Sequence, residues 1–200
     1  MIKIIINYWI LVFFYKIIYK YIYKYIYIMK LAITGEMASG KTSIAKYLVE
    51  KYNFTKFSFA DDVKLYATEI FDMNIKVKDR KLLQQFGTKM KEIDENIWIK
   101  RLNNKIKDIS DNIIIDDLRY PNEELYLKSK GFKILKLDIE TELQNNRLKN
   151  TYINNFNMHI ECKNHDSEIH TKFFNYDFYY LININTEKFI YEYIDNLIKN

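Results

Sequence analysis

From residue 30 onward, short apolar runs alternate with longer segments in which apolar residues recur every three or four positions. The short runs are typical of buried strands, and the periodic segments are typical of amphipathic helices. Their alternation indicates a parallel sheet covered by helices. We therefore predict strands near residues 31–34, 55–59, 112–116, 132–138 and 178–184. We predict helices near residues 41–52, 61–71, 80–93, 96–108, 122–130, 141–149 and 186–199.

Two stretches fit this alternation poorly. In residues 72–111, two predicted helices follow one another without an intervening strand. Residues 150–170 are polar and show no clear period. We interpret both as insertions into the regular order of strand and helix.

The first 28 residues differ from the rest, because they are almost wholly Ile, Tyr, Phe and Lys. Their longest uncharged run, residues 4–15, is shorter than the roughly 20 residues of a membrane-spanning helix. Lys16, Lys20 and Lys24 would share one helix face, which leaves an interfacial membrane helix as an alternative. No small-residue cleavage site follows the apolar run, so a signal peptide is disfavoured. We interpret residues 1–28 as a leader and Met29 as a candidate start.

Charge and cysteine content exclude some classes of function. The formal net charge is +5, and removing the four lysines of the acid-free leader leaves +1 for residues 29–200. This part therefore has no basic excess of the kind that binds nucleic acid. The single cysteine, Cys162, excludes an internal disulfide and fits a reducing compartment, so we expect a cytoplasmic protein, in the host cytoplasm if it is viral. A length of 200 residues suits one well-buried domain, which we place at residues 29–200.

The strongest motif is GEMASGKT at residues 35–42, which satisfies GxxxxGK[ST] between a predicted strand and a predicted helix. In such a phosphate-binding loop (P-loop) the glycines let backbone N–H groups face the phosphates. Lys41 would reach the β- and γ-phosphates, and the Thr42 hydroxyl would ligate Mg²⁺. The alternative is a chance glycine-rich turn. We therefore expect ATP and Mg²⁺ as cofactors. The predicted nucleotide-binding residues are Gly35, Glu36, Met37, Ala38, Ser39, Gly40, Lys41, Thr42 and Ser43.

A second candidate element is NIIIDD at residues 112–117, an apolar strand that ends in two carboxylates. An acid at this place can bind Mg²⁺ or its water shell. We predict Asp117 as the metal-binding acid, with Asp116 second. The structural alternative is that Asp117 caps the helix beginning near Pro121.

Arginine is rare, with four residues against 27 lysines. The rigid guanidinium fork suits phosphate better than a flexible ammonium does, so each arginine is a candidate phosphate ligand. Each could equally form a surface salt bridge. The four are Arg80, Arg101, Arg119 and Arg147.

Five further blocks carry a resemblance to a known family. They are SFADDVK at 58–64, RKLLQQFGT at 80–88, DENIW at 94–98, DLRYPNE at 117–123 and HDSE at 165–168. Together with the P-loop, and in the same order, they resemble the phage and viral deoxynucleoside monophosphate kinases over nearly all of residues 29–200. The resemblance implies a P-loop NTPase fold, a three-layer α/β structure with a five-stranded parallel sheet. It also implies that residues 72–111 form an acceptor-binding insertion and residues 150–170 a lid.

The implied reaction is transfer of the γ-phosphoryl group of ATP to a (deoxy)nucleoside monophosphate. The resemblance implies that Arg80 holds the acceptor's phosphate, Gln84 reads its base and Trp98 lines its pocket. It also places Asp61 and Lys64 at the acceptor. The residues predicted to act in catalysis are Lys41, Asp117, Arg119 and Arg147. Structurally, Gln84 could be a helix surface residue and Trp98 a core aromatic.

Other interpretations stay open at this point. A dephospho-coenzyme A kinase would phosphorylate a hydroxyl and would need an acid such as Asp61 or Asp62 to accept the proton. A P-loop switch would bind nucleotide without phosphoryl transfer. The lid would normally carry several arginines, yet only Arg147 is available, with Lys149 and Lys163 beside it.

Metal and partner predictions complete the sequence-based picture. The spacing of the lid-region histidines and cysteine matches no common zinc site, so zinc is not expected. These residues are His159, Cys162, His165 and His170. We expect small-molecule nucleotides as partners, no stable nucleic-acid partner, and no membrane contact except through residues 1–28. The oligomeric state stays open.

Overall fold

The computed structural model describes residues 11–16, 28–74, 79–152 and 170–199, apart from the side chains of Arg80, Lys172 and Phe173. Five strands form one sheet in which all neighbours run parallel. The strands are β1 (Lys30–Gly35), β2 (Thr55–Phe57), β3 (Ile113–Ile115), β4 (Lys133–Ile139) and β5 (Phe178–Ile182), in the spatial order β2-β3-β1-β4-β5. The predicted α/β class with a five-stranded parallel sheet is confirmed.

Helices connect these strands as the apolar pattern predicts, with three of them in succession between β2 and β3. They are α2 (Lys41–Tyr52), α3 (Ala60–Phe71), α4 (Arg80–Ile93), α5 (Ile97–Ile106), α6 (Pro121–Ser129), α7 (Thr141–Thr151) and α10 (Ile190–Lys199). Two short 3₁₀ helices, η2 (His170–Phe173) and η3 (Glu187–Phe189), flank β5 in the chain.

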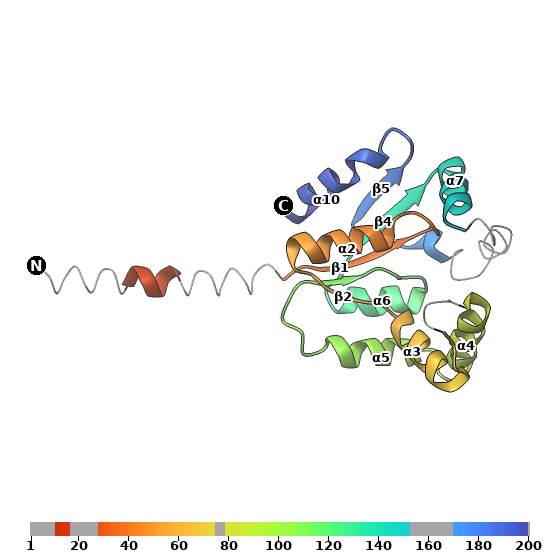
Figure 1. Ribbon diagram of the computed structural model, residues 1–200. Helices are drawn as coiled ribbons and strands as arrows, with labels where there is room; N and C mark the ends of the chain where they lie inside the picture. Colours follow the sequence, from red (N-terminus) through yellow and green to blue (C-terminus); the bar gives the residue numbers. More distant parts are fainter. Residues whose placement is uncertain (1–10, 17–27, 75–78, 153–169, 200) are drawn as a thin grey trace, which may run out of the picture.

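Helices cover both faces of the sheet (Figure 1). On β1, Leu31 and Ile33 point to the face that α2 and α10 cover, whereas Ala32 points to the face covered by α5 and α6. All three side chains are fully buried. Since successive side chains of a strand point to opposite faces, an uninterrupted apolar strand needs a helix layer on each side. The result is the predicted three-layer arrangement with two apolar cores.

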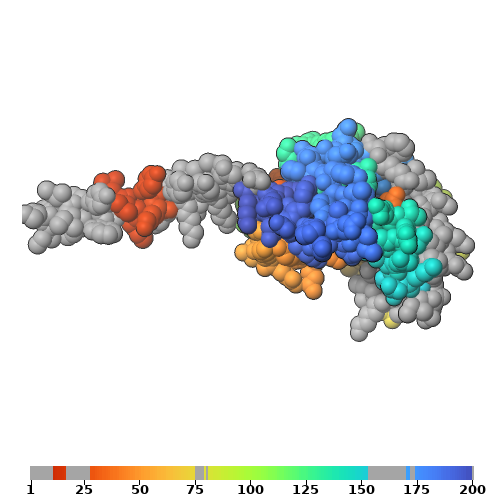
Figure 2. All heavy atoms as spheres, turned by 90° about the horizontal axis from the view of Figure 1, so that it is seen from above, coloured from red at the N-terminus to blue at the C-terminus, as the bar shows by residue number. Residues whose placement is uncertain are grey.

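Helices α2 and α10 lie side by side on one face (Figures 1 and 2). Besides their apolar contacts, Asp195 of α10 accepts hydrogen bonds from the hydroxyls of Tyr47 (2.6 Å) and Tyr52 (2.8 Å) and pairs with Lys51 (2.7 Å). These donors hold the pKa of Asp195 at about 2, with the Lys51 bond as the largest cause. This contact ties the C-terminal helix to the helix that follows the P-loop.

Two strands, β2 and β5, end two residues earlier than predicted, for local reasons. Strand β2 stops at Phe57 because the Ser58 hydroxyl and the next two backbone amides bond to Asp117 instead of continuing the sheet. Strand β5 stops at Ile182 because the Asn183 side chain accepts from the amides of Asn185 (2.9 Å) and Thr186 (3.0 Å), which makes a turn.

The predicted insertion is present as α4 and α5, which pack against α3 and against each other. In the described part of residues 72–111 no strand interrupts them. Most of the predicted lid, including His159, Cys162, Lys163 and His165, lies outside the described residues. Among the residues that are described, no helix is long and apolar enough to cross a membrane.

The topology locates a crevice at the carboxyl edge of the sheet. Strand β1 continues into α2 on one face, whereas β3 continues into α6 on the other face. Connections that leave neighbouring parallel strands in opposite directions open a crevice where ligands commonly bind. The GEMASGKT loop follows β1, and Asp116 and Asp117 follow β3, so both candidate motifs lie at this crevice.

Candidate active site

Glycine is required where the P-loop leaves β1. Gly35 has φ +141°, and a Cβ atom there would lie 2.1 Å from the backbone oxygen of Leu137 in β4. Gly40, the residue before α2, has φ +89°, in the left-handed region that only glycine occupies without strain. The two motif glycines therefore fit the backbone path, as predicted.

Lys41 lies over this loop. Its Nζ donates to the backbone oxygens of Gly35 (2.7 Å) and Glu36 (2.7 Å). Thr42 and Ser43 follow in the exposed first turn of α2. The first turn of a helix carries amides that lack intrahelical acceptors, and its dipole favours anions. A cation and a helix N-terminus therefore converge where an anionic ligand would sit.

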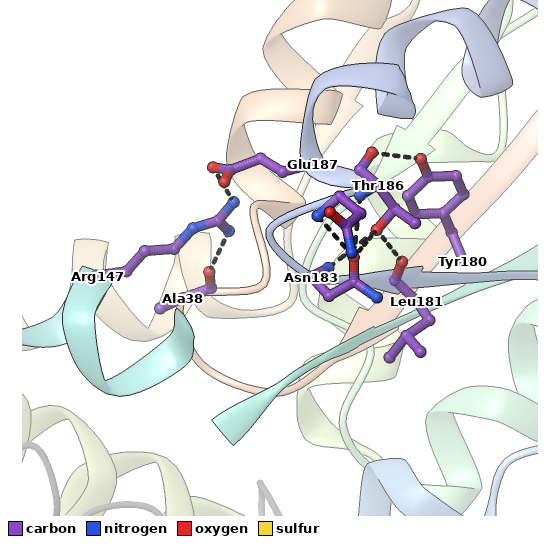
Figure 3. A network of polar contacts seen from close by, with 8 residues as sticks. Ala38, Arg147, Tyr180, Leu181, Asn183, Thr186 and Glu187 are labelled. Atoms are coloured by element: carbon purple, nitrogen blue, oxygen red, sulfur yellow. Dashed lines mark hydrogen bonds and ion pairs between the residues drawn. The ribbon is translucent and has the colours of Figure 1, made fainter. Parts of the chain in front are cut away.

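Two side chains of α7 donate hydrogen bonds to the backbone of the P-loop. Gln144 Nε2 donates to the backbone oxygen of Met37 at 2.9 Å, and Arg147 Nη1 donates to that of Ala38 at 2.8 Å. Figure 3 shows Arg147 reaching from α7 to both Ala38 and Glu187, whose Oε1 lies 2.6 Å from Nη2. The predicted catalytic residue Arg147 thus lies against the loop backbone.

A cavity of about 430 Å³ opens beside the loop. It is lined from the loop side, from the β2–α3 and β3–α6 connections, and from α4 and α5. Most predicted site residues outside the loop backbone meet in it. They are Lys41, Thr42, Asp61, Lys64, Gln84, Trp98, Asp117 and Arg119.

Some predicted residues lie elsewhere. Arg147 is not among the residues that line the cavity. Arg101 pairs with buried Asp62 at 3.0 Å, which is the structural role that we kept open for each arginine. The side chain of Arg80 is not described, so its predicted contact with the acceptor stays a prediction.

Trp98 fits both interpretations of an aromatic at its position. It is 5% exposed and belongs to the apolar core on the face of the sheet covered by α5 and α6, and its ring meets that of Phe86 edge-on. Its indole N–H donates to the backbone oxygen of Gly87 at 3.2 Å, which joins α5 to α4. The same side chain forms part of the cavity wall.

Asp117 connects the end of β3 to the start of α3. Its carboxylate accepts from the amides of Phe59 (2.9 Å) and Ala60 (2.9 Å) and from the Ser58 hydroxyl. Burial raises the pKa of Asp117, although these hydrogen bonds favour its ionised form. The alternative that Asp117 caps the helix near Pro121 is therefore wrong, since the helix it caps is α3.

Asp116 is 6% exposed and pairs with Lys56 Nζ at 2.6 Å. The cavity lining thus includes the Thr42 hydroxyl and, at the end of β3, the carboxylates of Asp116 and Asp117. Hard oxygen ligands of this kind suit Mg²⁺, which usually takes only one or two protein carboxylates and fills its shell with phosphate and water. Within the described ranges no cluster of three His, Cys, Asp or Glu residues forms a metal site. The donor set therefore fits a magnesium ion that arrives with a nucleotide.

Sequence reasoning missed two further titratable side chains at the cavity, Glu123 and Lys91. Glu123, 4% exposed, accepts from the amides of Arg119 (3.0 Å) and Tyr120 (3.1 Å), and burial raises its pKa to about 8. Opposite it, Lys91 Nζ lies 3.0 Å from the centroid of the Tyr120 ring, and burial lowers the pKa of Lys91. Glu123 carries a partial signal, because it is the third residue of a helix that begins with Pro121, where a glutamate can accept from the amide before the helix. Lys91 carries no signal in a chain with 27 lysines.

No protein-family model matches the chain. Among curated proteins, it is 26% identical over 140 residues to a protein of Acanthamoeba polyphaga mimivirus named "Putative deoxynucleotide monophosphate kinase", a match that covers 54% of this chain and 72% of that protein. It is also 31% identical over 108 residues to an uncharacterised protein of Ictalurid herpesvirus 1, covering 52% of this chain but only 47% of that protein. The predicted resemblance to viral nucleoside monophosphate kinase-like proteins is confirmed.

Solved structures agree on the fold. A Thermus thermophilus protein superimposes with a TM-score of 0.52 at 15% identity, and a shikimate kinase from Bacteroides thetaiotaomicron with a TM-score of 0.51 at 13% identity. Each match covers 86% of this chain and 97% of the other. At such low identity these similarities establish the fold and nothing finer. The chain has the P-loop NTPase fold, as predicted.

Proposed function

We propose that this P-loop kinase-like protein transfers the γ-phosphoryl group of ATP to a deoxynucleoside monophosphate. The observation that carries the proposal is the cavity of about 430 Å³, which joins the P-loop to a set of side chains suited to a second anionic ligand. Its lining includes Lys41 and Thr42 of the P-loop and, from other elements, Lys64, Trp98 and Arg119. The name of the mimivirus relative supports this acceptor class.

The proposed chemistry needs no general base. The phosphate oxygen of a monophosphate is already an anion at neutral pH, so the protein has to align two phosphates and offset their repulsion. Lys41 would hold the β- and γ-phosphates, and Arg119 would contact phosphate beside Asp117. Arg147 remains a predicted phosphate contact, which it would make through guanidinium N–H groups other than the one that donates to Ala38.

The protein's own residues would bind Mg²⁺ through the Thr42 hydroxyl and the acids at the end of β3. Asp117, the predicted ligand, accepts hydrogen bonds from the Phe59 and Ala60 amides at the start of α3, and Asp116 forms an ion pair with Lys56. When bound, the ion would neutralise charge on the transferred phosphoryl group. Asp117 would in addition hold the start of α3, and with it Asp61 and Lys64, at a fixed distance from the loop.

On the acceptor side we propose that Arg80 holds the monophosphate and that Gln84 reads the base. Gln84 lines the cavity from α4, one turn beyond Arg80. Trp98 would supply an apolar wall, and Asp61 and Lys64 a polar one. This division assigns α3, α4 and α5 to the acceptor and the P-loop to ATP.

A hydroxyl acceptor is the second candidate, and one observation weighs against it. Such a reaction needs an acid to take the hydroxyl proton. Asp62, 3% exposed, is bound by Arg101 (3.0 Å) and Lys105 (2.6 Å). Of the two candidate acids only Asp61 lines the cavity, where it pairs with Lys64 at 3.5 Å. One acid is therefore held by two cations away from the cavity, and the other already has a cationic partner, which makes neither well suited to accept a proton.

The deciding experiment incubates the full chain with ATP, Mg²⁺ and one acceptor at a time. Deoxynucleoside monophosphates, ribonucleoside monophosphates and dephospho-coenzyme A are compared, and ADP and phosphorylated product are both measured. We expect ADP release to depend on a deoxynucleoside monophosphate and to match diphosphate formed. Phosphorylation of dephospho-coenzyme A alone would favour the hydroxyl kinase. ATP binding without any transfer would favour the switch.

A further inference from the structure

The structure points to a role for α7 that no sequence motif indicates. We propose that Gln144, together with Arg147, is a positioning residue that keeps the P-loop in its phosphate-binding shape by holding the strained residue Ala38. The inference rests on the proposed binding of ATP at this loop. It concerns how the loop is held, and Gln144 itself is not expected to touch the nucleotide.

Ala38 needs an external restraint. Its φ of +63° lies in the left-handed region, which the Cβ atom of an L-amino acid disfavours. Unlike Gly35 and Gly40, which also have positive φ, Ala38 cannot take this conformation without cost. A residue held in such a state persists only when its surroundings fix it.

The restraint comes from both sides of Ala38. The oxygen of Met37 belongs to the peptide group before Ala38, and the oxygen of Ala38 to the one after it. The first accepts from Gln144 and the second from Arg147. Two bonds from one helix therefore fix both peptide planes whose relative rotation defines the φ and ψ angles of Ala38.

The same bonds set the direction of an amide. In a planar trans peptide the C=O and N–H groups point in opposite directions. Turning the Met37 oxygen toward α7 therefore turns the Ala38 N–H away from α7. Since a P-loop binds phosphate through its backbone N–H groups, the orientation of this peptide affects binding directly.

Position and burial suit Gln144 to this task. Gln144 and Arg147 are three residues apart, so they lie on the same face of α7. Gln144 is 3% exposed and Met37 8%, so water cannot readily replace the side-chain donor. Arg147 is itself held by Glu187 (2.6 Å), as Figure 3 shows, and its Nη1 lies 3.9 Å from where a Cβ atom on Gly40 would be.

Gln144→Met tests the role, because methionine keeps the length and shape of the side chain but has no donor. We expect ATP affinity to fall about 10-fold, in line with the loss of a buried hydrogen bond, while the KM for the monophosphate stays within about twofold. Hydrogen exchange of residues 35–42, measured without nucleotide, should become faster. The matched control is Asn146→Met on the exposed side of α7, which should change neither quantity.

Ala38→Gly separates positioning from simple packing. Glycine enters the left-handed region without strain, so the loop should need the Gln144 bond less. In the Ala38→Gly background we expect Gln144→Met to weaken ATP binding by less than about threefold. An equal penalty in both backgrounds would overturn the proposal, as would unchanged hydrogen exchange in residues 35–42.

A failure of this inference can be distinguished from misfolding of the variant and from a failure of the proposed function. If Gln144→Met does not fold, Gln144→Asn withdraws the same amide by one methylene and should give a smaller loss in the same direction. If the wild-type chain binds no ATP, the proposed function fails and this inference with it. If the wild type binds ATP and Gln144→Met binds it equally well, only this inference fails.

Discussion

The two sides of the cavity are built in different ways. On the nucleotide side, the backbone of the P-loop forms the site, with glycines at both ends and carbonyls held by Gln144 and Arg147. On the proposed acceptor side, charged and aromatic side chains of α3, α4 and α5 line the cavity, among them the ion pair Asp61–Lys64 at 3.5 Å. One side depends on main-chain shape, the other on which side chains are present.

This difference predicts how each side responds to change. A backbone site has few acceptable residues at its key positions, because a single Cβ atom can block the chain path. A side-chain site can lose one group and keep its shape, so substitutions there should alter affinity for one ligand more than folding. Four substitutions test this contrast, from the largest expected effect to the smallest.

Gly35→Ala should have the largest effect, because its Cβ atom would lie 2.1 Å from the Leu137 oxygen and the residue would keep a φ of +141°. Both the strand contact and the loop would have to move. We expect the free energy of unfolding to drop by about 3 kcal/mol or more. Urea denaturation followed by circular dichroism measures this.

The control for Gly35→Ala is Gly131→Ala. Gly131 also has positive φ, +79°, but no atom lies within 4 Å of its ideal Cβ position. Only the backbone strain remains, so a loss of about 1 kcal/mol is expected. Equal losses in the two variants would mean that contact with β4 does not restrict the loop.

Lys41→Ala should lower kcat/KM for ATP by about 100-fold or more, since it removes the cation that we propose holds the β- and γ-phosphates. The comparison is Lys64→Ala, which removes a lysine from the other side of the same cavity. There we expect a rise of about 10-fold in the acceptor KM and little change in the ATP KM. Steady-state kinetics with each substrate varied in turn distinguishes the two. Turnover by Lys41→Ala within a few-fold of wild type would contradict the site assignment.

These contrasts also explain what could be predicted from the sequence. The strands, the helices and the P-loop were predictable because apolar period and glycine spacing depend on local geometry. Asp116 and Asp117 were predictable as the end of a buried strand. Even the early end of β5 follows a local rule, the side-chain turn at Asn183, once that turn is recognised.

Contacts between distant segments were not predictable. Nothing near Gln144 indicates that it meets Met37, which is 107 residues away in the chain. The hydrogen bond that the Ala60 amide at the start of α3 donates to Asp117 likewise depends on strand order, because β3 lies next to β2 in the sheet. Sequence period identifies each element, whereas the order of strands decides which ends meet.

Arg80→Ala should affect the acceptor and leave ATP nearly unchanged. A charge-assisted hydrogen bond to phosphate contributes about 1.5–3 kcal/mol, so we expect the acceptor KM to rise roughly 10- to 100-fold. Lys89→Ala is the matched control on the same helix, since Lys89 is exposed and pairs locally with Glu92 at 2.8 Å. An effect of Arg80→Ala confined to the ATP KM would mean that ATP and the acceptor have been assigned to the wrong sides of the cavity.

Glu123→Gln should give the smallest effect, which is a change in the pH dependence of stability. Burial raises the pKa of Glu123 from 4.5 to about 8, so between these values the folded chain holds a proton that the unfolded chain has lost. Folded protein that binds more protons becomes less stable as pH rises. The wild-type free energy of unfolding should therefore fall, on account of this group, as pH rises from about 4.5 to about 8.

A glutamine amide in place of the Glu123 carboxyl would stay neutral over this range and could still accept from the Arg119 and Tyr120 amides, so the variant should lose most of that slope. Asp117, whose pKa burial also raises, leaves a residual slope of the same sign. Urea denaturation at pH 5, 6.5 and 8 measures the difference, and parallel curves for wild type and variant would show that Glu123 is ionised throughout. The Arg119 and Tyr120 amides and nearby Lys91 would then keep the buried Glu123 carboxylate ionised. This part of the cavity would be as insensitive to pH over that range as the hydrogen bond from Gln144 to Met37 on the nucleotide side.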